Sequence, residues 1–286
     1  MSASRSGWFA WCVLTLGFAF LYVPILILIA YSFNESKLAT VWSGFSFKWY
    51  GALFRDRDML GAAWISLKVA FFTACGSAVL GTLASLVMTR MRHFRTRTLF
   101  GALITAPLVM PEVILGLSLL LLFVSAGNAL NGLGIGDFQP KGVLTIWISH
   151  VTFTLAFVTV VISSRMAELD KSLEEAAMDL GANRVKVFFQ ITLPIIAPAI
   201  VAGWLLAFTL SLDDVVISSF VTGPGSTTLP IKVFSSVRLG LNPKINALAT
   251  IMVVVVSAVA VLGWWWTRRN EIRRQRDMQL ALQDNG

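Results

Sequence analysis

Three acidic residues lie in stretches of the sequence that are otherwise almost entirely apolar. Glu112 follows the segment APLVMP and has two prolines before it, Pro107 and Pro111. Asp213 and Asp214 are adjacent, near the end of another apolar run. Acids inside a membrane are costly and usually face a bundle interior or a water-filled cavity. Carboxylates, and the carbonyl oxygens that a proline-broken helix frees, are suited to coordinate a cation. These residues therefore predict a path for a positively charged solute.

The same acids have plainer interpretations, which the sequence leaves open. Glu112 could be hydrogen-bonded to a neighbouring span, or protonated. Counted from Pro194, Asp213 and Asp214 fall near the outer end of their span, where water could solvate them. Alternatively, they form an acidic vestibule that receives a dication from a delivery protein. On one helix the two side chains would diverge by about 100 degrees, so only one of them would face the interior.

Residues for catalysis or metal binding are missing from the pattern. No nucleophile and base accompany the acids. Cys12 and Cys75 lie in separate apolar runs, and His93 and His150 are far apart, so neither a redox pair nor a metal site is expected. No G-x-x-x-x-G-K-[ST] loop is present to hold phosphates, and the Gly-rich segment 221–230 lacks the lysine. We expect a non-catalytic chain with no metal and no cofactor of its own.

The composition is that of a membrane protein. The 286 residues are 56% hydrophobic and only 13% charged, with a mean hydropathy of +0.76. A soluble protein of this length could not bury so much apolar surface. The formal net charge is +8, but no basic patch is interleaved with exposed aromatic residues, so nucleic-acid binding is not expected.

Several apolar runs are long enough to cross a bilayer core of roughly 30 Å as helices. The six predicted spans lie near residues 8–32, 64–89, 99–126, 143–164, 195–219 and 245–267. The first is too long for the apolar core of a signal peptide, so it is interpreted as a retained span. The second carries two small-xxx-small pairs, Ala74–Ala78 and Gly81–Ser85, which we expect to pack inside the bundle.

Loop charges predict the orientation. The side with the N-terminus, the 90–98 and 165–194 loops and the C-terminal tail holds more Lys and Arg than the other side. The richer side should be cytoplasmic. Both termini and the 165–194 loop are therefore expected inside. The predicted parts are 1–63 (first helix and outer segment), 64–267 (five-helix transmembrane domain) and 268–286 (cytoplasmic tail).

One cytoplasmic segment, residues 172–194, is polar and strongly patterned. Ser172 followed three residues later by Glu175 predicts a capping box at a helix start. Gly181 supplies a left-handed residue for the helix end. Pro194 stands at the start of the fifth span, where a missing amide is tolerated.

An apolar stripe runs along this short helix. It consists of Leu173, Ala176, Ala177 and Leu180, spaced i, i+3, i+4 and i+7. Its small residues would let another surface come close. From the pattern alone, the stripe could pack on its own bundle, on lipid headgroups or on another protein.

The same segment resembles the EAA signature of bacterial ABC-type importer permeases. The matching positions are Glu175, Ala176, Ala177, Gly181, Ile191, Leu193 and Pro194. In that family the loop helix docks in a groove on a separate ATPase subunit and transmits its motion. The resemblance implies an ATPase-coupling loop made of Ser172, Glu175, Ala176, Ala177, Asp179, Gly181, Ile191, Leu193 and Pro194.

The resemblance extends nearly end to end. YSFNESKL, FKWYGALFRD, APLVMPEVILGLSLLLLF, LSLDDVVISSFVTGPGSTTLP and FSSVRLGLNPKINALAT are similar to segments of putrescine/spermidine importer permeases, most of all the second permease of putrescine importers. It implies an all-α membrane protein with six transmembrane helices, the ABC type-1 importer permease fold and a cytoplasmic coupling helix.

The implied assembly lies in a bacterial inner membrane. It contains a second homologous permease, two copies of an ATPase that bind ATP and Mg²⁺, and a periplasmic polyamine-binding protein. Putrescine is the expected cargo, although related permeases carry other small solutes. A proton- or sodium-driven secondary transporter with Glu112 as its coupling acid is the other class considered. It predicts an inverted internal repeat, which the sequence does not show.

Overall fold

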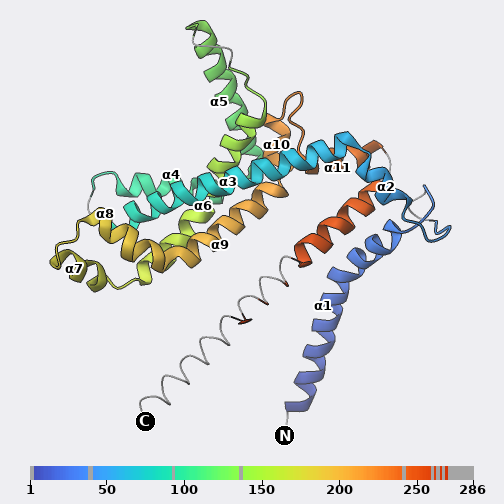
Figure 1. Ribbon diagram of the computed structural model, residues 1–286, viewed down its shortest axis with the longest axis horizontal. Helices are drawn as coiled ribbons and strands as arrows, with labels where there is room; N and C mark the ends of the chain where they lie inside the picture. The colour runs from blue at the N-terminus through green and yellow to red at the C-terminus, as the bar shows by residue number, and fades with distance from the viewer. Residues whose placement is uncertain are drawn as a thin grey trace. The chain divides into compact units, whose positions relative to one another are not determined.

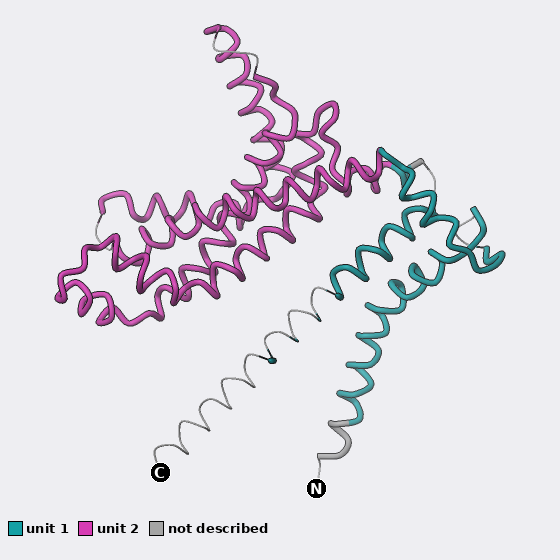
Figure 2. Tube along the Cα trace, in the orientation of Figure 1, with its two compact units in different colours: residues 1–57, 236–286 teal, residues 58–235 magenta. Residues whose placement is uncertain are grey.

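A computed structural model describes residues 3–37, 41–91, 94–134, 138–239 and 243–258, with residues 261, 265, 268 and 269. The described chain is helical, apart from one isolated bridge between Asn34 and Phe45 (Figure 1). It divides into two compact units, residues 1–57 with 236–286 and residues 58–235 (Figure 2). These units do not coincide with the three predicted parts, whose boundaries were placed after residues 63 and 267. The three-part division stays a prediction.

Five described helices are long and apolar enough to cross a membrane. The first is α1 (Ala3–Ser32), which contributes the 25-residue apolar stretch Trp8–Ser32. In the most apolar part of this stretch, no residue is buried within the chain. α3 (Arg57–Arg90), α5 (Glu112–Gly132) and α6 (Val143–Glu168) follow. The fifth is a continuous stretch, Arg184–Leu212, made of α8 (Arg184–Val187), η1 (Phe188–Thr192) and α9 (Leu193–Leu212).

The third predicted span, 99–126, is wrong as a single helix. The structure divides it into α4 (Arg97–Val109) and α5. Met110 adopts an extended conformation (φ −76°, ψ 134°), which is favoured for a residue before proline, and Pro111 has no amide to continue the helix. α5 consequently leaves in a different direction from α4 (Figure 1).

The fifth predicted span, 195–219, is also interrupted. α9 ends at Leu212, and a six-residue helix, α10 (Val216–Val221), follows after a short break that holds Asp213 and Asp214. The argument that the two acids diverge along one helix is therefore wrong. The sixth predicted span, 245–267, appears as a helix over Pro243–Ala258, and most of its later residues lie outside the described ones.

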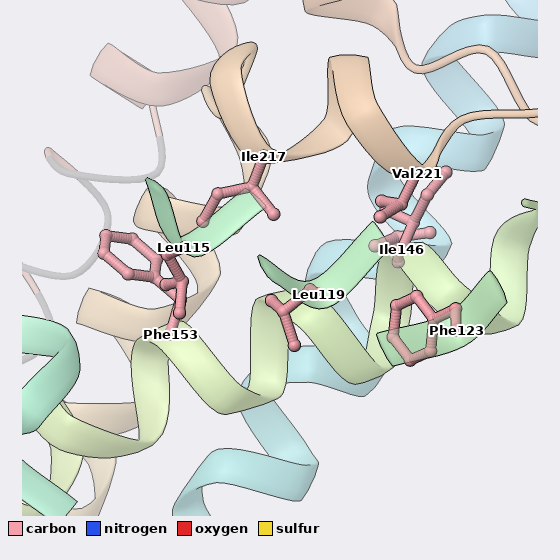
Figure 3. Close-up of a cluster of buried hydrophobic side chains, with 8 residues drawn as sticks. Leu115, Leu119, Phe123, Ile146, Phe153, Ile217 and Val221 are labelled. Carbon is pink, nitrogen blue, oxygen red and sulfur yellow. The ribbon is translucent and has the colours of Figure 1, made fainter. Parts of the chain in front are cut away.

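Packing within unit 2 joins helices that are far apart in sequence. α9 lies beside α6, and α5 packs on α10. One buried apolar cluster is drawn from α3, α5, α6 and α10, and Figure 3 shows Leu115 and Leu119 near Ile217. A second gathers around Val158 and Ile196, between α6 and α9. Such close contacts fix the directions of the helices around both breaks.

Small residues bring α3 and α6 close together. A side chain added at Gly81 would come within 2.8 Å of Val158, and the Ser77 and Thr154 hydroxyls are 2.7 Å apart. Ser85 donates to the carbonyl of Thr159. The small-residue pairs of the second span therefore pack inside the chain's own bundle, as predicted.

Unit 1 contains α1, α2 (Lys48–Phe54) and the Pro243–Ala258 helix. Trp49 is buried and donates its indole N–H to the carbonyl of Asn34. Lys244 and Asp56 form an ion pair of 3.0 Å. α11 (Leu229–Leu239) begins in unit 2, where its first amide donates to the Ser66 hydroxyl.

Candidate functional site

The predicted cytoplasmic helix is present as α7 (Ser172–Asp179), but it is capped differently from the prediction. The Ser172 amide donates to a carboxylate oxygen of Asp170 at 3.0 Å, and the residue preceding the helix, Lys171, makes no side-chain cap. The capping box of Ser172 and Glu175 is therefore wrong, because the helix begins one residue earlier than that motif requires. Hydrogen bonds from the Ser172 amide and hydroxyl lower the pKa of the exposed Asp170 carboxyl.

Gly181 ends α7, as the sequence predicts. Its φ is +88°, and its amide donates to the Met178 carbonyl. The Ala182 amide donates to the carbonyl of Ala177. Together these bonds form a Schellman motif, which needs a left-handed residue at this position. A side chain at Gly181 would meet nothing within 4 Å, so the backbone angle alone demands glycine.

The two faces of α7 have different surroundings. Leu173, Ala176 and Leu180 of the predicted stripe are exposed, Leu180 to 90%. Ala177 is half-buried, and Asp179 and Glu175 are exposed. Of the interpretations that the pattern left open, packing of the stripe on its own bundle does not hold for these three exposed residues. α7 lies at one end of unit 2 (Figure 1), and its exposed Leu173 and Leu180 form an apolar surface there.

A different face of α7 carries a residue that sequence reasoning missed. Glu174 accepts hydrogen bonds from Arg90 at the end of α3 and from the Thr192 hydroxyl. Its neighbour Glu175, which the signature selects, makes no such contact in the described structure. Helix phase could have separated it from the stripe: at about 100° per residue, Glu174 lies roughly 100° around the helix from Leu173 and on the same side as Met178.

The rest of the signature lies where the loop becomes the fifth span. Asn183 caps α8 by accepting the Lys186 amide at 2.8 Å. Pro194 is in the first turn of α9, as predicted. Because proline has no amide, the preceding turn is bonded as a π-helix, seen in the bond from the Leu193 amide to the Phe188 carbonyl. Ile191 and Leu193 are half-buried there.

The break between α4 and α5 places Glu112 at a helix start. Pro107 is buried within α4, Pro111 precedes α5, and Glu112 is the first residue of α5 with an exposed side chain. A carboxylate in the first turn is favoured by the helix dipole. The depth argument, which assumed one continuous helix from residue 99, is replaced by a broken helix with an acid at the break. Its role in a solute path stays a prediction.

The break between α9 and α10 contains a closed polar cluster. Asp214 is buried and accepts the amides of Ile217 and Ser218, so it caps α10. Its carboxylate lies 3.1 Å from His150 Nε2, and His150 Nδ1 lies 2.7 Å from the Ser211 hydroxyl. The solvated reading of Asp214 is therefore wrong. The sequence showed only that His150 is far from His93, and the 64 residues between His150 and Asp214 gave no sign of their contact.

Asp213, by contrast, is exposed beside this cluster. Its carboxylate could still meet a solute, and its place in a vestibule stays a prediction. Both oxygens of Asp214 already accept hydrogen bonds from the chain, which disfavours it as the group that receives an amine. Within the described ranges, no three His, Cys, Asp or Glu residues lie close enough to hold a metal ion. His93 lies outside them.

Residues 77–275 match the family described as "Binding-protein-dependent transport system inner membrane component". The chain belongs to this family. The matched range includes α7, the contacts of Glu174 with Arg90 and Thr192, and both helix breaks. As a member of the family, the protein is an inner membrane component of a transport system.

Full-length relatives agree with this assignment. The chain is 58% identical over 269 residues to the "Putrescine transport system permease protein PotI" of Escherichia coli K12, covering 94% of each protein. It is 41% identical to the "Spermidine/putrescine transport system permease protein PotC" of Haemophilus influenzae, over 88% of this chain and 94% of that protein.

Solved structures support the fold of the family. A bacterial ABC transporter involved in the import of alginate matches with a TM-score of 0.71, over 90% of this chain and 94% of that one. A chain of the MetNI methionine ABC transporter matches with a TM-score of 0.57. At 20% and 14% identity these matches establish the architecture alone, which is that of an ABC importer permease.

Proposed function

We propose that this chain is a permease subunit of an ATP-driven importer of polyamines, with putrescine as its main cargo. The observation that carries the proposal is the 58% identity to a putrescine permease over 94% of both chains. The chain would form the translocation path with a second, related permease. The ATP and Mg²⁺ chemistry would belong to two copies of a partner ATPase, and this chain would be non-catalytic. A periplasmic binding protein would deliver the polyamine.

The exposed apolar face of α7 supports docking of the ATPase. Leu173, Ala176 and Leu180 form this face, on a helix with well-defined ends and no buried residue. A short capped helix that exposes leucines to water is destabilising by itself, so a partner that covers the face explains why it persists. In this arrangement the 165–194 loop and both termini are cytoplasmic.

The two helix breaks support a path for a dication. Glu112 and Asp213 are exposed acids, each next to a break. A flexible diamine needs carboxylates or carbonyls for its ammonium groups and apolar walls for its methylenes. We place Glu112 and Asp213 along the path, with Pro107 and Pro111 keeping the first break open.

Transport by the native complex tests the proposal. The complex would be purified through a tag on this chain and placed in liposomes, with the binding protein outside and ATP inside. Labelled putrescine should accumulate only when the ATP can be hydrolysed. Spermidine uptake under the same conditions measures the second cargo, which the 41% identity to a spermidine/putrescine permease makes a specific candidate. Accumulation by the isolated chain on a proton or sodium gradient without ATP would contradict the proposal.

A charge on the apolar face tests the docking. Leu180→Glu should abolish co-purification of the ATPase while the chain still inserts and folds. Leu133→Glu is a matched control, because Leu133 is also exposed (71%) just after a helix, α5, far from α7. Equal ATPase recovery with both variants would exclude this face as the docking surface.

A further inference from the structure

α7 is attached to the membrane helices by few side-chain contacts. None of its eight residues is buried, and Leu173, Ala176 and Leu180 point away from the chain. The contacts that remain are concentrated at Glu174. Arg90 Nε lies 2.9 Å from one carboxylate oxygen of Glu174, and Arg90 Nη2 lies 2.9 Å from the other. A two-pronged contact of this kind fixes direction as well as distance.

The same carboxylate connects further helices. The Thr192 hydroxyl donates to Glu174 at 2.8 Å, and Thr192 is buried in the turn that leads into α9. Arg90 also reaches the carbonyl of Met166, near the end of α6, at 3.4 Å. Glu174 is thus the point where α7 meets the cytoplasmic ends of α3 and α9, with α6 one contact further.

The ion pair is partly shielded, with each side chain about 15% exposed. A fully exposed pair would contribute little and would exchange freely with water. A fully buried pair would carry a large desolvation cost. Shielding of this degree, with a third hydrogen bond from Thr192, keeps the pair formed while α7 itself stays accessible to a partner.

We propose that Glu174, held by Arg90 and Thr192, is the positioning residue that passes movement of α7 to α3 and α9 during ATP-driven transport. The inference rests on the proposed function, in which a partner grips the exposed face of α7. The exposed residues that meet the partner and the residue that passes on the movement then lie on different faces of one helix. If Glu174 did not contact Arg90 and Thr192, displacing α7 would move the loop but leave the membrane helices in place.

Charge reversal at the Arg90–Glu174 ion pair, in the native complex, tests this proposal. Arg90→Glu and Glu174→Arg should each raise the ATP hydrolysed per putrescine imported about tenfold, within the range of coupling free energies between sites. Co-purification of the ATPase should be unchanged. The double variant, which restores opposite charges, should recover most of the coupling. Swapping the exposed pair Arg165–Glu168 in the same way is the control and should change nothing.

A milder variant keeps the test decisive if charge reversal prevents assembly. Thr192→Val removes one hydrogen bond to Glu174 and leaves both charges, so the ATP consumed per solute should rise about threefold, as expected for one lost bond. Unchanged stoichiometry in Thr192→Val and no recovery in the double variant would overturn the proposal. Failure of the wild-type complex to import putrescine with ATP would instead overturn the proposed function.

Discussion

Asp214 and Glu174 are both carboxylates held by hydrogen bonds from distant parts of unit 2, yet their surroundings differ. Asp214 is buried between α9 and α10 with His150, whose ring is 1% exposed. Glu174 is partly exposed and belongs to α7, which lies at the other end of the unit (Figure 1) and has an exposed apolar face. Asp214 is enclosed by its own chain, whereas Glu174 lies beside an apolar surface that none of the described residues covers.

This difference separates a fixed part of the protein from a movable one. The donors to Asp214 are two backbone amides and a buried histidine, so any change in its position breaks several bonds at once. Glu174 is joined through the ends of flexible side chains, and α7 buries nothing. Regions with few buried apolar contacts open at low free-energy cost. The break between α9 and α10 should therefore resist displacement, and α7 should follow its proposed partner.

Asp214→Ala is expected to have the largest effect. It removes the buried acceptor of two amides and leaves His150 Nε2 with only the Ser218 hydroxyl, which should lower the free energy of unfolding by about 3 kcal/mol. The measurement is thermal unfolding of the purified complex in detergent. Asp213→Ala is the matched control, because Asp213 is adjacent but exposed. Equal melting temperatures for the two variants would show that burial of Asp214 does not hold this break in place, and the contrast with Glu174 would fail.

Much of the architecture followed from the sequence because it is set by local composition. Apolar runs located the long helices, and Gly181 marked the end of α7 since only its backbone angle was needed. The break at Pro111 was obscured because hydrophobicity continues across it, although the proline itself was visible. Apolarity reports the environment of a segment and not the continuity of its hydrogen bonds.

The polar contacts between distant segments could not be predicted from local composition. His150 and Asp214 are 64 residues apart, and Arg90 and Glu174 are 84 apart, so no local spacing relates either pair. At the start of α7, Asp170 and Ser172 were both suitable caps, and the choice depended on where the chain leaves α6. Such pairings are decided by tertiary packing.

Gly181→Val should have the next largest effect, and it acts on the movable end. A β-branched residue at φ +88° is strained by about 2 kcal/mol, so the Schellman turn should open and uptake should uncouple from ATP hydrolysis. Gly181→Asn should retain most activity, since asparagine tolerates left-handed angles. Gly132→Val, at the end of α5 with no neighbour within 4 Å, is the control. Coupled uptake in Gly181→Val would mean that the shape of this turn is irrelevant.

Glu112→Gln should have a smaller effect, confined to the solute. Losing one charge interaction of about 1 kcal/mol should reduce putrescine uptake at low concentration roughly fivefold, with assembly intact. Glu168→Gln removes an exposed carboxylate at the end of α6 and should leave uptake unchanged. The initial rate of uptake against putrescine concentration is the measurement. Full transport by Glu112→Gln would remove this acid from the path.

The smallest expected effect concerns the pH dependence of the start of α7. The pKa of Asp170 is lowered from 3.8 in the folded protein by hydrogen bonds from the Ser172 amide and hydroxyl. A lowered folded pKa means that the carboxylate's contribution is fully present above the unfolded pKa. It is lost as the pH falls through the folded value, which lies below 3.8. The first turn of α7 should therefore fray only in strong acid.

Hydrogen exchange of the Ser172 amide measures this fraying. At neutral pH, Asp170→Ala should remove the protection that the carboxylate gives to this amide. Asp170→Asn should keep part of it, because its side-chain oxygen still accepts without a charge. In wild type the protection factor should fall only as the pH drops below 3.8, whereas in Asp170→Asn it should not change there. If wild type instead lost protection near neutral pH, another group would control the start of the helix that meets the partner.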